Sequence, residues 1–151
     1  MRRFLFRLQH MFNMKVHARK EIEQRLGVIT SRCNALDDRM QELIQRRTNA
    51  NDQNHAGGSI LENLHHRAGF SAFVDQELAK LKQERAVAEE QRLKIIEEYH
   101  EALQAEKVLE KLREKREREY YLEAARKEEK EVEDIVTDRY IREGGVDGQL
   151  Q

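Results

Sequence analysis

The sequence lacks proline and tryptophan, contains one cysteine, and has only 6% aromatic residues. Because proline ends or kinks a helix, its absence removes the usual interruptions of long helices. A single cysteine excludes a disulfide within the chain, which is typical of a protein from a reducing cytoplasm. Cys33 lies in an apolar stripe at helical spacing, which indicates a packed side chain rather than a reactive thiolate.

Long apolar runs are also missing. No stretch approaches about 18 apolar residues, so we expect no direct insertion into a membrane. The opening residues, MRRFLFRLQHMF, resemble a targeting signal, but Arg7 and Gln9-His10 interrupt the apolar part. A secretory signal needs an unbroken apolar centre. The sequence therefore predicts a soluble, cytoplasmic protein that is peripheral to a membrane through a partner.

Residues that build catalytic, cofactor or metal sites are scarce or badly spaced. Gly57-Gly58 lacks the Lys-Ser/Thr that completes a phosphate-binding loop. Glutamates on a solvated helix are surface charges rather than acid–base catalysts. His65 and His66 are adjacent on an expected helix, so they point in different directions and do not form a zinc ligand pair. We expect no catalytic residue, no cofactor and no metal site.

Charged residues are as common as hydrophobic ones, at 38% each, and the net charge is −1. Residues 1–47 carry eleven Lys/Arg and five Asp/Glu, a balance of +6, whereas residues 75–143 carry sixteen and twenty-one, a balance of −5. Two helices of opposite sign favour antiparallel pairing, although each exposed pair contributes less than about 1 kcal/mol. Near-neutral charge argues against nucleic-acid binding, which needs a basic face.

Apolar residues in the first third of the chain recur at steps of three and four, the spacing of a coiled-coil seam. This spacing predicts a first helix over residues 3–47. The predicted seam positions are Phe4, Leu8, Met11, Lys15, Ala18, Ile22, Leu26, Ile29, Cys33, Leu36, Met40 and Leu43. Two successive steps of four around Ile22 form a stutter, which should unwind the supercoil locally.

A stretch rich in Asn and Gly follows, so residues 48–70 are predicted to form a loop and a short helix. Ser59 is placed to cap the short helix, and Gly69 to bend the chain. A long helix is predicted over residues 71–142, because 48 of the 69 residues from 75 to 143 are Ala, Glu, Lys, Leu or Arg. Residues 143–151 are predicted to be a disordered tail.

Two columns of residues seven apart mark the seam of this long helix. The first column holds Val74, Leu81, Ala88, Ile95, Ala102 and Leu109. The second column holds Leu78, Arg85, Arg92, Tyr99, Glu106 and Arg113. The pattern dissolves beyond Leu109, and the second helix exceeds the first by about 25–30 residues, or about 40 Å. The sequence thus predicts an all-α fold in one domain, 1–151: a long antiparallel two-helix coiled coil, or helical hairpin, with an overhanging C-terminal helix.

The overhang carries an apolar strip. Its residues are Val132, Ile135, Val136, Tyr140 and Ile141. Stripes at helical spacing usually serve packing, so the strip could fold against Phe4–Leu8 or self-associate. Alternatively, the strip is a docking surface for another protein.

Several segments of the chain form a recognisable set. RFLFRLQ opens the chain at residues 3–9, and FSAFVDQEL at 70–78 leads into the long helix. QAEKVLEKLREKR occupies 104–116 and is followed by EYY at 119–121 and a charged run to Arg139. These segments cover most of the chain outside residues 48–60 and the tail. Together they resemble the flagellar export protein family FliJ.

The resemblance implies a non-enzymatic component of the bacterial flagellar type III protein export apparatus, needed for flagellum biogenesis and hence for motility and chemotaxis. Family members resemble the central stalk of rotary ATPases. The implied partners are the hexameric export ATPase, the cytoplasmic domain of the export gate, and export chaperones. The implied location is the cytoplasm, with peripheral association to the inner membrane through the export apparatus.

The same resemblance assigns contacts to parts of the chain. The ATPase-facing part would be the paired termini and the overhang, with contacts at Leu112, Tyr120, Tyr121, Ile135 and Tyr140. Gate and chaperone contacts would lie near the hairpin tip, at Leu43, Arg46 and Phe73.

Three other functions are compatible with parts of the pattern. One is the related stalk of a virulence-type injectisome. Another is a coiled-coil finger that enters RNA polymerase, but such a finger needs paired acidic residues at its tip, where this chain has only Asp52. The third is a generic structural coiled coil that serves interaction only, which would keep apolar residues along the whole second helix.

Overall fold

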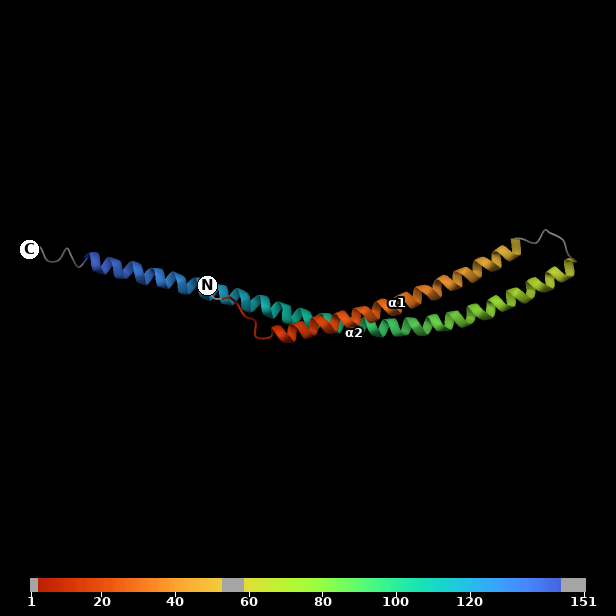
Figure 1. The fold of residues 1–151 in the computed structure, drawn as a ribbon, viewed down its shortest axis with the longest axis horizontal. Helices are drawn as coiled ribbons and strands as arrows, with labels where there is room; N and C mark the ends of the chain where they lie inside the picture. Colours follow the sequence, from red (N-terminus) through yellow and green to blue (C-terminus); the bar gives the residue numbers. More distant parts are fainter. Residues whose placement is uncertain (1–2, 53–58, 145–151) are drawn as a thin grey trace, which may run out of the picture. The chain divides into compact units, whose positions relative to one another are not determined.

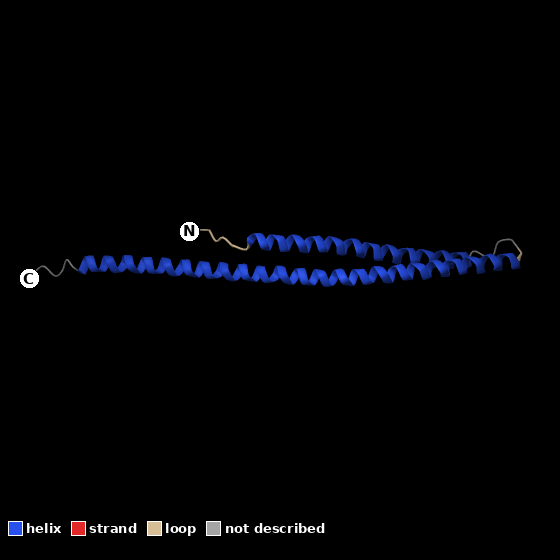
Figure 2. Ribbon diagram, turned by 90° about the horizontal axis from the view of Figure 1, so that it is seen from below, coloured by secondary structure: helices blue, strands red, loops and turns tan. Residues whose placement is uncertain are grey.

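The computed structural model describes residues 3–52 and 59–144. Its helices are α1, Gln9–Asp52, with 44 residues, and α2, Ile60–Gly144, with 85 residues (Figure 1). Within the described residues there is no strand, and the two helices pack together as a hairpin (Figure 2). The predicted fold class, an all-α antiparallel coiled coil with an overhanging C-terminal helix, is confirmed.

Internal contacts divide the chain into two compact units. The first unit consists of Met1–Val16 with Gln104–Gln151, and the second of His17–Leu103. Each unit is described by itself below. The single domain expected over 1–151 stays a prediction.

In the second unit, α1 and α2 run antiparallel and bury a narrow apolar seam between them (Figures 1 and 2). The buried residues are Ile29, Cys33, Val74, Leu78, Leu81 and Ala88. Cys33 is only 2% exposed and forms no disulfide, which confirms its predicted role as a packed residue. Both predicted columns of α2 face inward, since every member from Val74 to Arg113 is buried or half-buried.

Three ion pairs across the seam record the antiparallel direction, because the α2 partner number falls as the α1 number rises. Arg25 pairs with Glu98 at 2.9 Å, Asp37 with Arg85 at 3.0 Å, and Arg47 with Asp75 at 2.7 Å. Two of the three join an arginine of α1 to a carboxylate of α2, as the opposite charge balances of the helices predict. These pairs are partly exposed, so each contributes modestly to stability.

The predicted register of α1 is right from Ile22 onward and wrong before it. Met11, Lys15 and Ala18 are exposed, whereas Phe12 and Val16, one position later than Met11 and Lys15, are half-buried. The guanidinium of Arg113 lies 5.8 Å from the centre of the Phe12 ring. Burying a phenylalanine and a valine removes more apolar surface from water than burying a methionine and a lysine, whose charge would have to be desolvated.

The predicted ends of the first helix, at residues 3 and 47, are both wrong. At the start, Phe4–Leu8 is not helical, and the amide of Gln9 donates to the carbonyl of Phe6 in a tight turn. At the end, helix α1 continues through Thr48 and Asn49 to Asp52. The Thr48 hydroxyl donates to the Ile44 carbonyl, and Arg67 of α2 donates to the Asn51 carbonyl at 2.7 Å. The arginine thus satisfies a carbonyl that the helix end leaves open.

The predicted separation of a short helix from a long helix starting at residue 71 is also wrong. Ser59 does precede the first turn of α2, since its carbonyl accepts the amide of Asn63, but the helix then continues through Gly69 without a break. Contacts on both sides of the glycine hold the helix, namely Arg67 bonded to α1 and Val74 fully buried. The predicted loop positions 53–58 and the tail positions 145–151 lie outside the described residues, and Glu143 and Gly144 are helical rather than part of a tail.

The helical glycine at position 69 gives a direct test of this continuity. A methyl group there would meet no atom within 4 Å, and the same holds for Gly27 in α1. Because alanine favours a helix interior over glycine by about 0.8–1 kcal/mol, we expect Gly69→Ala to raise the free energy of unfolding by roughly that amount. Urea denaturation followed by circular dichroism measures the change. Gly27→Ala serves as the matched variant, and stabilisation by Gly27→Ala alone would mean that the chain bends at Gly69.

Candidate partner-binding surfaces

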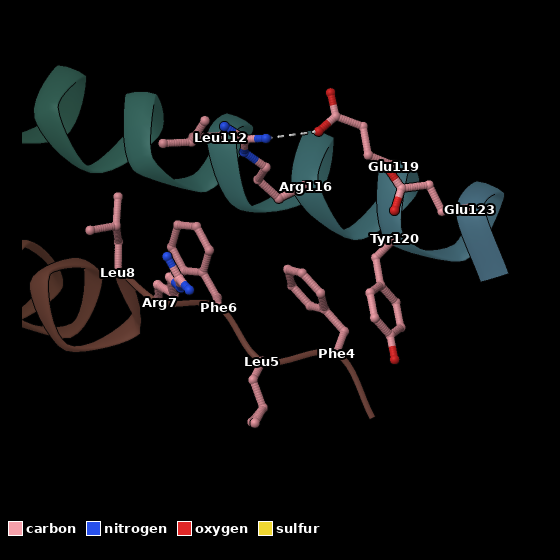
Figure 3. Close-up of a pocket in the computed structure, with 10 residues that line it drawn as sticks. All are labelled: Phe4, Leu5, Phe6, Arg7, Leu8, Leu112, Arg116, Glu119, Tyr120 and Glu123. Carbon is pink, nitrogen blue, oxygen red and sulfur yellow. Dashed lines mark hydrogen bonds and ion pairs between the residues drawn. The ribbon is translucent and has the colours of Figure 1, made fainter. Parts of the chain in front are cut away.

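A non-helical N-terminal segment, Phe4–Leu8, lies along α2 in the first unit; it is extended up to Phe6 and then turns into α1 (Figure 3). Phe4, Phe6 and Leu8 are half-buried, whereas Leu5 and Arg7 between them are exposed. This alternation is the signature of an extended chain, in which successive side chains point to opposite sides. The motif Phe-x-Phe-x-Leu has the same period of two, so the sequence contained a signal for an extended segment at a place where a helix was predicted.

A partly open cavity of about 540 Å³ lies between this segment and α2. Its walls include Leu112, Arg116 and Tyr120 from α2 (Figure 3). The rings of Phe4 and Tyr120 are 5.7 Å apart, and Arg116 pairs with Glu119 at 3.2 Å. Two of the predicted ATPase contacts, Leu112 and Tyr120, therefore lie together and already pack against the chain's own N-terminal segment.

Beyond Ala124, every residue of α2 up to Gly144 is exposed, so these twenty residues pack against no other described segment of the unit. The sequence predicts a longer unpaired part, of about 25–30 residues. The difference arises because an extended chain advances about 3.3 Å per residue and a helix only about 1.5 Å. The N-terminal segment therefore reaches further along α2 than a helix of the same residues would.

The apolar strip of this unpaired end is exposed throughout. Val132, Ile135 and Val136 are at least 59% exposed and share a face, and Tyr140 extends that face from Val136 by one turn. Packing of the strip against Phe4–Leu8, one of the predicted alternatives, is wrong, because that segment lies on Leu112–Glu123 instead. Ile141 lies on a different side of the helix from the strip. It belongs to the heptad column that runs from Tyr120 through Lys127 and Asp134.

The side chain of Tyr121 lies on the exposed side of α2 and is not part of the cavity wall. It lies eleven residues, or about three helical turns, before Val132, so the two side chains share a side of α2. Its ring is 47% exposed and contacts the ring of Tyr120 at 5.6 Å. The structure therefore places Tyr121, Ile135 and Tyr140 along one side of the helix end, with Ile135 and Tyr140 at opposite edges of the strip.

The predicted gate and chaperone contacts lie on the second unit and differ in exposure. Leu43 is half-buried in the seam, so it supports the hairpin more than it offers a surface. Arg46 is exposed and pairs with Glu42 at 2.6 Å. Phe73 is 53% exposed, and Phe70 nearby is also exposed. The strongest candidate for a contact among the three is therefore Phe73.

Sequence reasoning missed other exposed apolar side chains. Ile60, Leu61 and Leu64 are exposed on the first turns of α2, and Leu5, Met11 and Met14 near the N-terminus. Met11 is a predicted seam residue. It is exposed because the seam runs one residue later, through Phe12. Runs of adjacent apolar residues such as Ile60-Leu61 were the available signal, because two neighbours on a helix cannot both face a narrow seam.

An ionic cluster replaces apolar residues in part of the seam. Arg92 holds the Glu89 carboxylate with two hydrogen bonds, of 3.0 and 2.6 Å, and Arg85 bridges Glu89 at 2.7 Å to Asp37 of α1. The hydrogen bonds from Arg92, and next those from Arg85, lower the pKa of Glu89 to about 2. In return, hydrogen bonds to Glu89 and then Asp37 raise the pKa of Arg85. The cluster joins the two helices through the bond between Arg85 and Asp37.

The described residues offer neither a metal site nor a membrane span. Among residues 3–52 and 59–144, no group of three His, Cys, Asp or Glu side chains is placed to hold a metal ion. Neither described helix has a stretch both long and apolar enough to cross a bilayer. The candidate sites are accordingly surfaces: the cavity under the N-terminal segment, the exposed side of the α2 end, and the surroundings of Phe73.

An antiparallel helical hairpin with an unpaired C-terminal helix end defines the class, a coiled-coil interaction protein. Residues 4–145 match a family model described as Flagellar FliJ protein. The chain therefore belongs to the FliJ family and is a protein associated with flagellar protein export. Comparisons with curated proteins and with solved structures found no match. The family assignment supports the flagellar system over the injectisome, the polymerase finger and a generic structural coiled coil.

The ionic cluster predicts a pH dependence of stability. Because the folded-state pKa of Glu89, about 2, is below its unfolded value of about 4.3, its contribution is present above about pH 5 and is lost as the pH falls towards 2. We expect Glu89→Gln to destabilise the protein at pH 7, and the gap from wild type to close at pH 2. Denaturant unfolding at pH 7, 4 and 2 measures this gap.

The neighbouring carboxylate provides the control for this test. Glu90 pairs with Lys94 at 3.2 Å, and both side chains are 69% exposed. Glu90→Gln should therefore shift stability little at any pH. A gap for Glu89→Gln that stays constant between pH 7 and pH 2 would show that the carboxylate charge does not stabilise the seam.

Proposed function

We propose that the protein is a non-enzymatic stalk that couples the hexameric export ATPase to the export gate of the flagellar apparatus. One observation carries the proposal: the last twenty residues of α2 pack against none of the other residues that the structure describes in their unit, and they expose an apolar strip. Exposed apolar surface on a charged helix indicates a site of protein contact. Peripheral association with the inner membrane through the apparatus, and aid in delivery of export chaperones and substrates, belong to the same proposal.

The unpaired end of α2 carries apolar side chains on one side and charged side chains on the others. Val132, Ile135 and Val136 lie on one side, and Lys127, Lys130 and Asp134 on others. Inside a ring of identical subunits, such a helix contacts one subunit through apolar groups and another through charges. Unequal contacts give unequal binding free energies, so they bias the conformations and nucleotide sites of the subunits. That bias is the physical basis of a coupling role.

The N-terminal segment Phe4–Leu8 and the part of α2 that it covers add a second contact region on the same unit. The cavity under Phe4–Leu8 is partly open and has both apolar and charged walls. Tyr121, on the exposed side, continues the strip towards this region. We assign Leu112 and Tyr120 to holding the N-terminal segment on α2, and Tyr121, Ile135 and Tyr140 to direct contact with the ATPase.

Contacts with the gate and with chaperones are assigned to the second unit, around Phe73. Its aromatic ring is exposed beside Phe70, and exposed aromatic residues are frequent anchors of protein interfaces. Arg46 offers a charged contact, although Glu42 already pairs with it. Leu43 contributes indirectly, through packing of the seam.

The ATPase contact can be tested by placing charge on the strip. The double variant Val132→Asp, Val136→Asp should raise the stalk concentration needed for half-maximal stimulation of the cognate ATPase about tenfold or more. The reason is that the new carboxylates would be buried in the interface without a partner of opposite charge. Truncation after Ala124 should abolish the stimulation while leaving the hairpin helical by circular dichroism. ATP turnover at increasing stalk concentration measures both effects.

The control substitution for this test is on the same helix and in the same unit as the strip. Val108 is 66% exposed and outside the strip, so Val108→Asp has similar chemistry and should leave stimulation unchanged. Normal stimulation by the truncated chain would refute the assignment of the unpaired end. Equal losses in the Val108 and Val132 variants would mean that charge anywhere on the unit disturbs the ATPase.

The gate contact has its own matched pair of variants. Phe73 and Leu93 are both 53% exposed on α2 within the second unit. Phe73→Ala should weaken binding of the gate's cytoplasmic domain about tenfold, as loss of an interface anchor does, and Leu93→Ala should not. Isothermal titration calorimetry measures both dissociation constants. Unchanged affinity for the Phe73 variant would remove the gate contact from this part of the hairpin.

A further inference from the structure

The N-terminal end of the chain has a charge pattern unlike the rest. Residues 1–20 contain six Lys or Arg and no Asp or Glu, and the first acidic residue is Glu21. The whole chain, by contrast, has a net charge of −1. Among the described residues of the first unit, the cations of this end are Arg3, Arg7 and Lys15, all exposed. The end therefore forms a local patch of positive charge.

These three cations have no carboxylate partner in the described part of the chain. Ion pairs do form on α2 in the same unit, where Glu119 accepts Arg116 at 3.2 Å and Lys115 at 4.0 Å. The carboxylates of α2 thus neutralise cations of their own helix and leave the N-terminal ones uncompensated. An uncompensated patch attracts an anionic partner, and the attraction weakens as salt increases.

Apolar side chains are exposed among these charges. Leu5 is 84% exposed, and its side chain points away from α2 (Figure 3). Met11 and Met14 are also exposed, and they share a face of α1 with Lys15, since positions three and four apart are neighbours on a helix. The half-buried Phe12 and Val16 occupy the other side. The N-terminal end therefore combines unpaired cations with solvent-exposed apolar groups.

We propose that this N-terminal patch binds the surface of an anionic lipid bilayer directly. Lys and Arg side chains reach phosphate headgroups, and each contributes to attraction by the negative surface potential. Leu5, Met11 and Met14 enter the boundary between headgroups and acyl chains, as the apolar residues of interfacial segments do. The binding is peripheral and reversible, because three cations and three apolar side chains give a weak anchor.

A lipid surface fits both features of the patch, whereas an acidic protein segment fits one. An acidic segment would neutralise Arg3, Arg7 and Lys15 and leave the exposed Leu5, Met11 and Met14 in water. Methionine and lysine side chains are long and flexible, so they adapt to a fluid surface that has no fixed shape. The patch residues differ from Tyr121, Ile135 and Tyr140, which are assigned to direct contact with the ATPase, so the inference does not depend on that contact.

Vesicle flotation of the full-length protein tests the proposal. Vesicles of phosphatidylcholine with 30% phosphatidylglycerol should bind the protein at 50 mM salt, and binding should fall strongly at 500 mM salt. Pure phosphatidylcholine vesicles should bind it far less. Neutralising the patch with Arg3→Gln, Arg7→Gln and Lys15→Gln should weaken binding about 100-fold, since each cation contributes about a factor of five.

A matched triple variant separates the patch from net charge. Arg126→Gln, Lys127→Gln and Lys130→Gln remove the same charge from the acid-rich end of α2 and should leave vesicle binding nearly unchanged. Because the chain has no tryptophan, Leu5→Trp adds a single fluorescent probe at an exposed position, and its emission should shift to the blue on vesicle binding. Circular dichroism verifies that each variant remains helical.

Several outcomes would overturn the proposal. Absence of wild-type binding to the anionic vesicles at 50 mM salt is one, and equal binding to neutral vesicles is another. An equal loss in the two triple variants would show that net charge, and not the patch, governs binding. Binding to polyglutamate without binding to vesicles would identify an acidic protein as the partner instead.

Discussion

The narrow seam between α1 and α2 is the constraint on which the rest of the molecule depends. Two helices can bury only one stripe each, and in the second unit that stripe contains just six buried residues. A seam this thin leaves most side chains in water, which explains how 38% charged residues are compatible with a fold. It also leaves the outer faces of both helices free, so the functional chemistry of this protein lies on surfaces.

Polar residues inside the seam give the pairing its direction and register. A stripe repeating at sevens could pair in several registers offset by a heptad, because each offset matches apolar residues again. Arg85 breaks this degeneracy: it bonds Asp37 of α1 and Glu89 of its own helix, and Arg92 completes the cluster. Another register would separate Arg85 from Asp37 and leave a half-buried arginine with one partner fewer, which is unfavourable. The ionic cluster thus acts more on specificity than on net stability.

The end of the seam determines where binding surfaces occur. The column of sevens in α2 is continued after Tyr120 by Lys127 and Asp134, which cannot pack against an apolar segment. The N-terminal segment covers α2 only as far as Glu123, and the apolar residues beyond it gather on another side of the helix. Free surfaces at both chain ends follow from this arrangement: an apolar strip on α2 and a cationic patch before Glu21.

The sequence by itself determined the fold class, the two columns of α2 and the burial of Cys33, because a repeat of seven residues is a local property of the chain. Of the candidate sites, it located the strip from Val132 to Tyr140 and the exposed Phe73, but not the exposure of Leu5, Met11 and Met14. Only the tertiary structure decided between Met11 and Phe12 for the seam, since two apolar sets one residue apart satisfy the same spacing. It also decided that Phe4–Leu8 is not helical and that α2 continues through Gly69. In each case the physical reason is the same: the side that becomes buried depends on the surface of the partner segment, which local spacing does not contain.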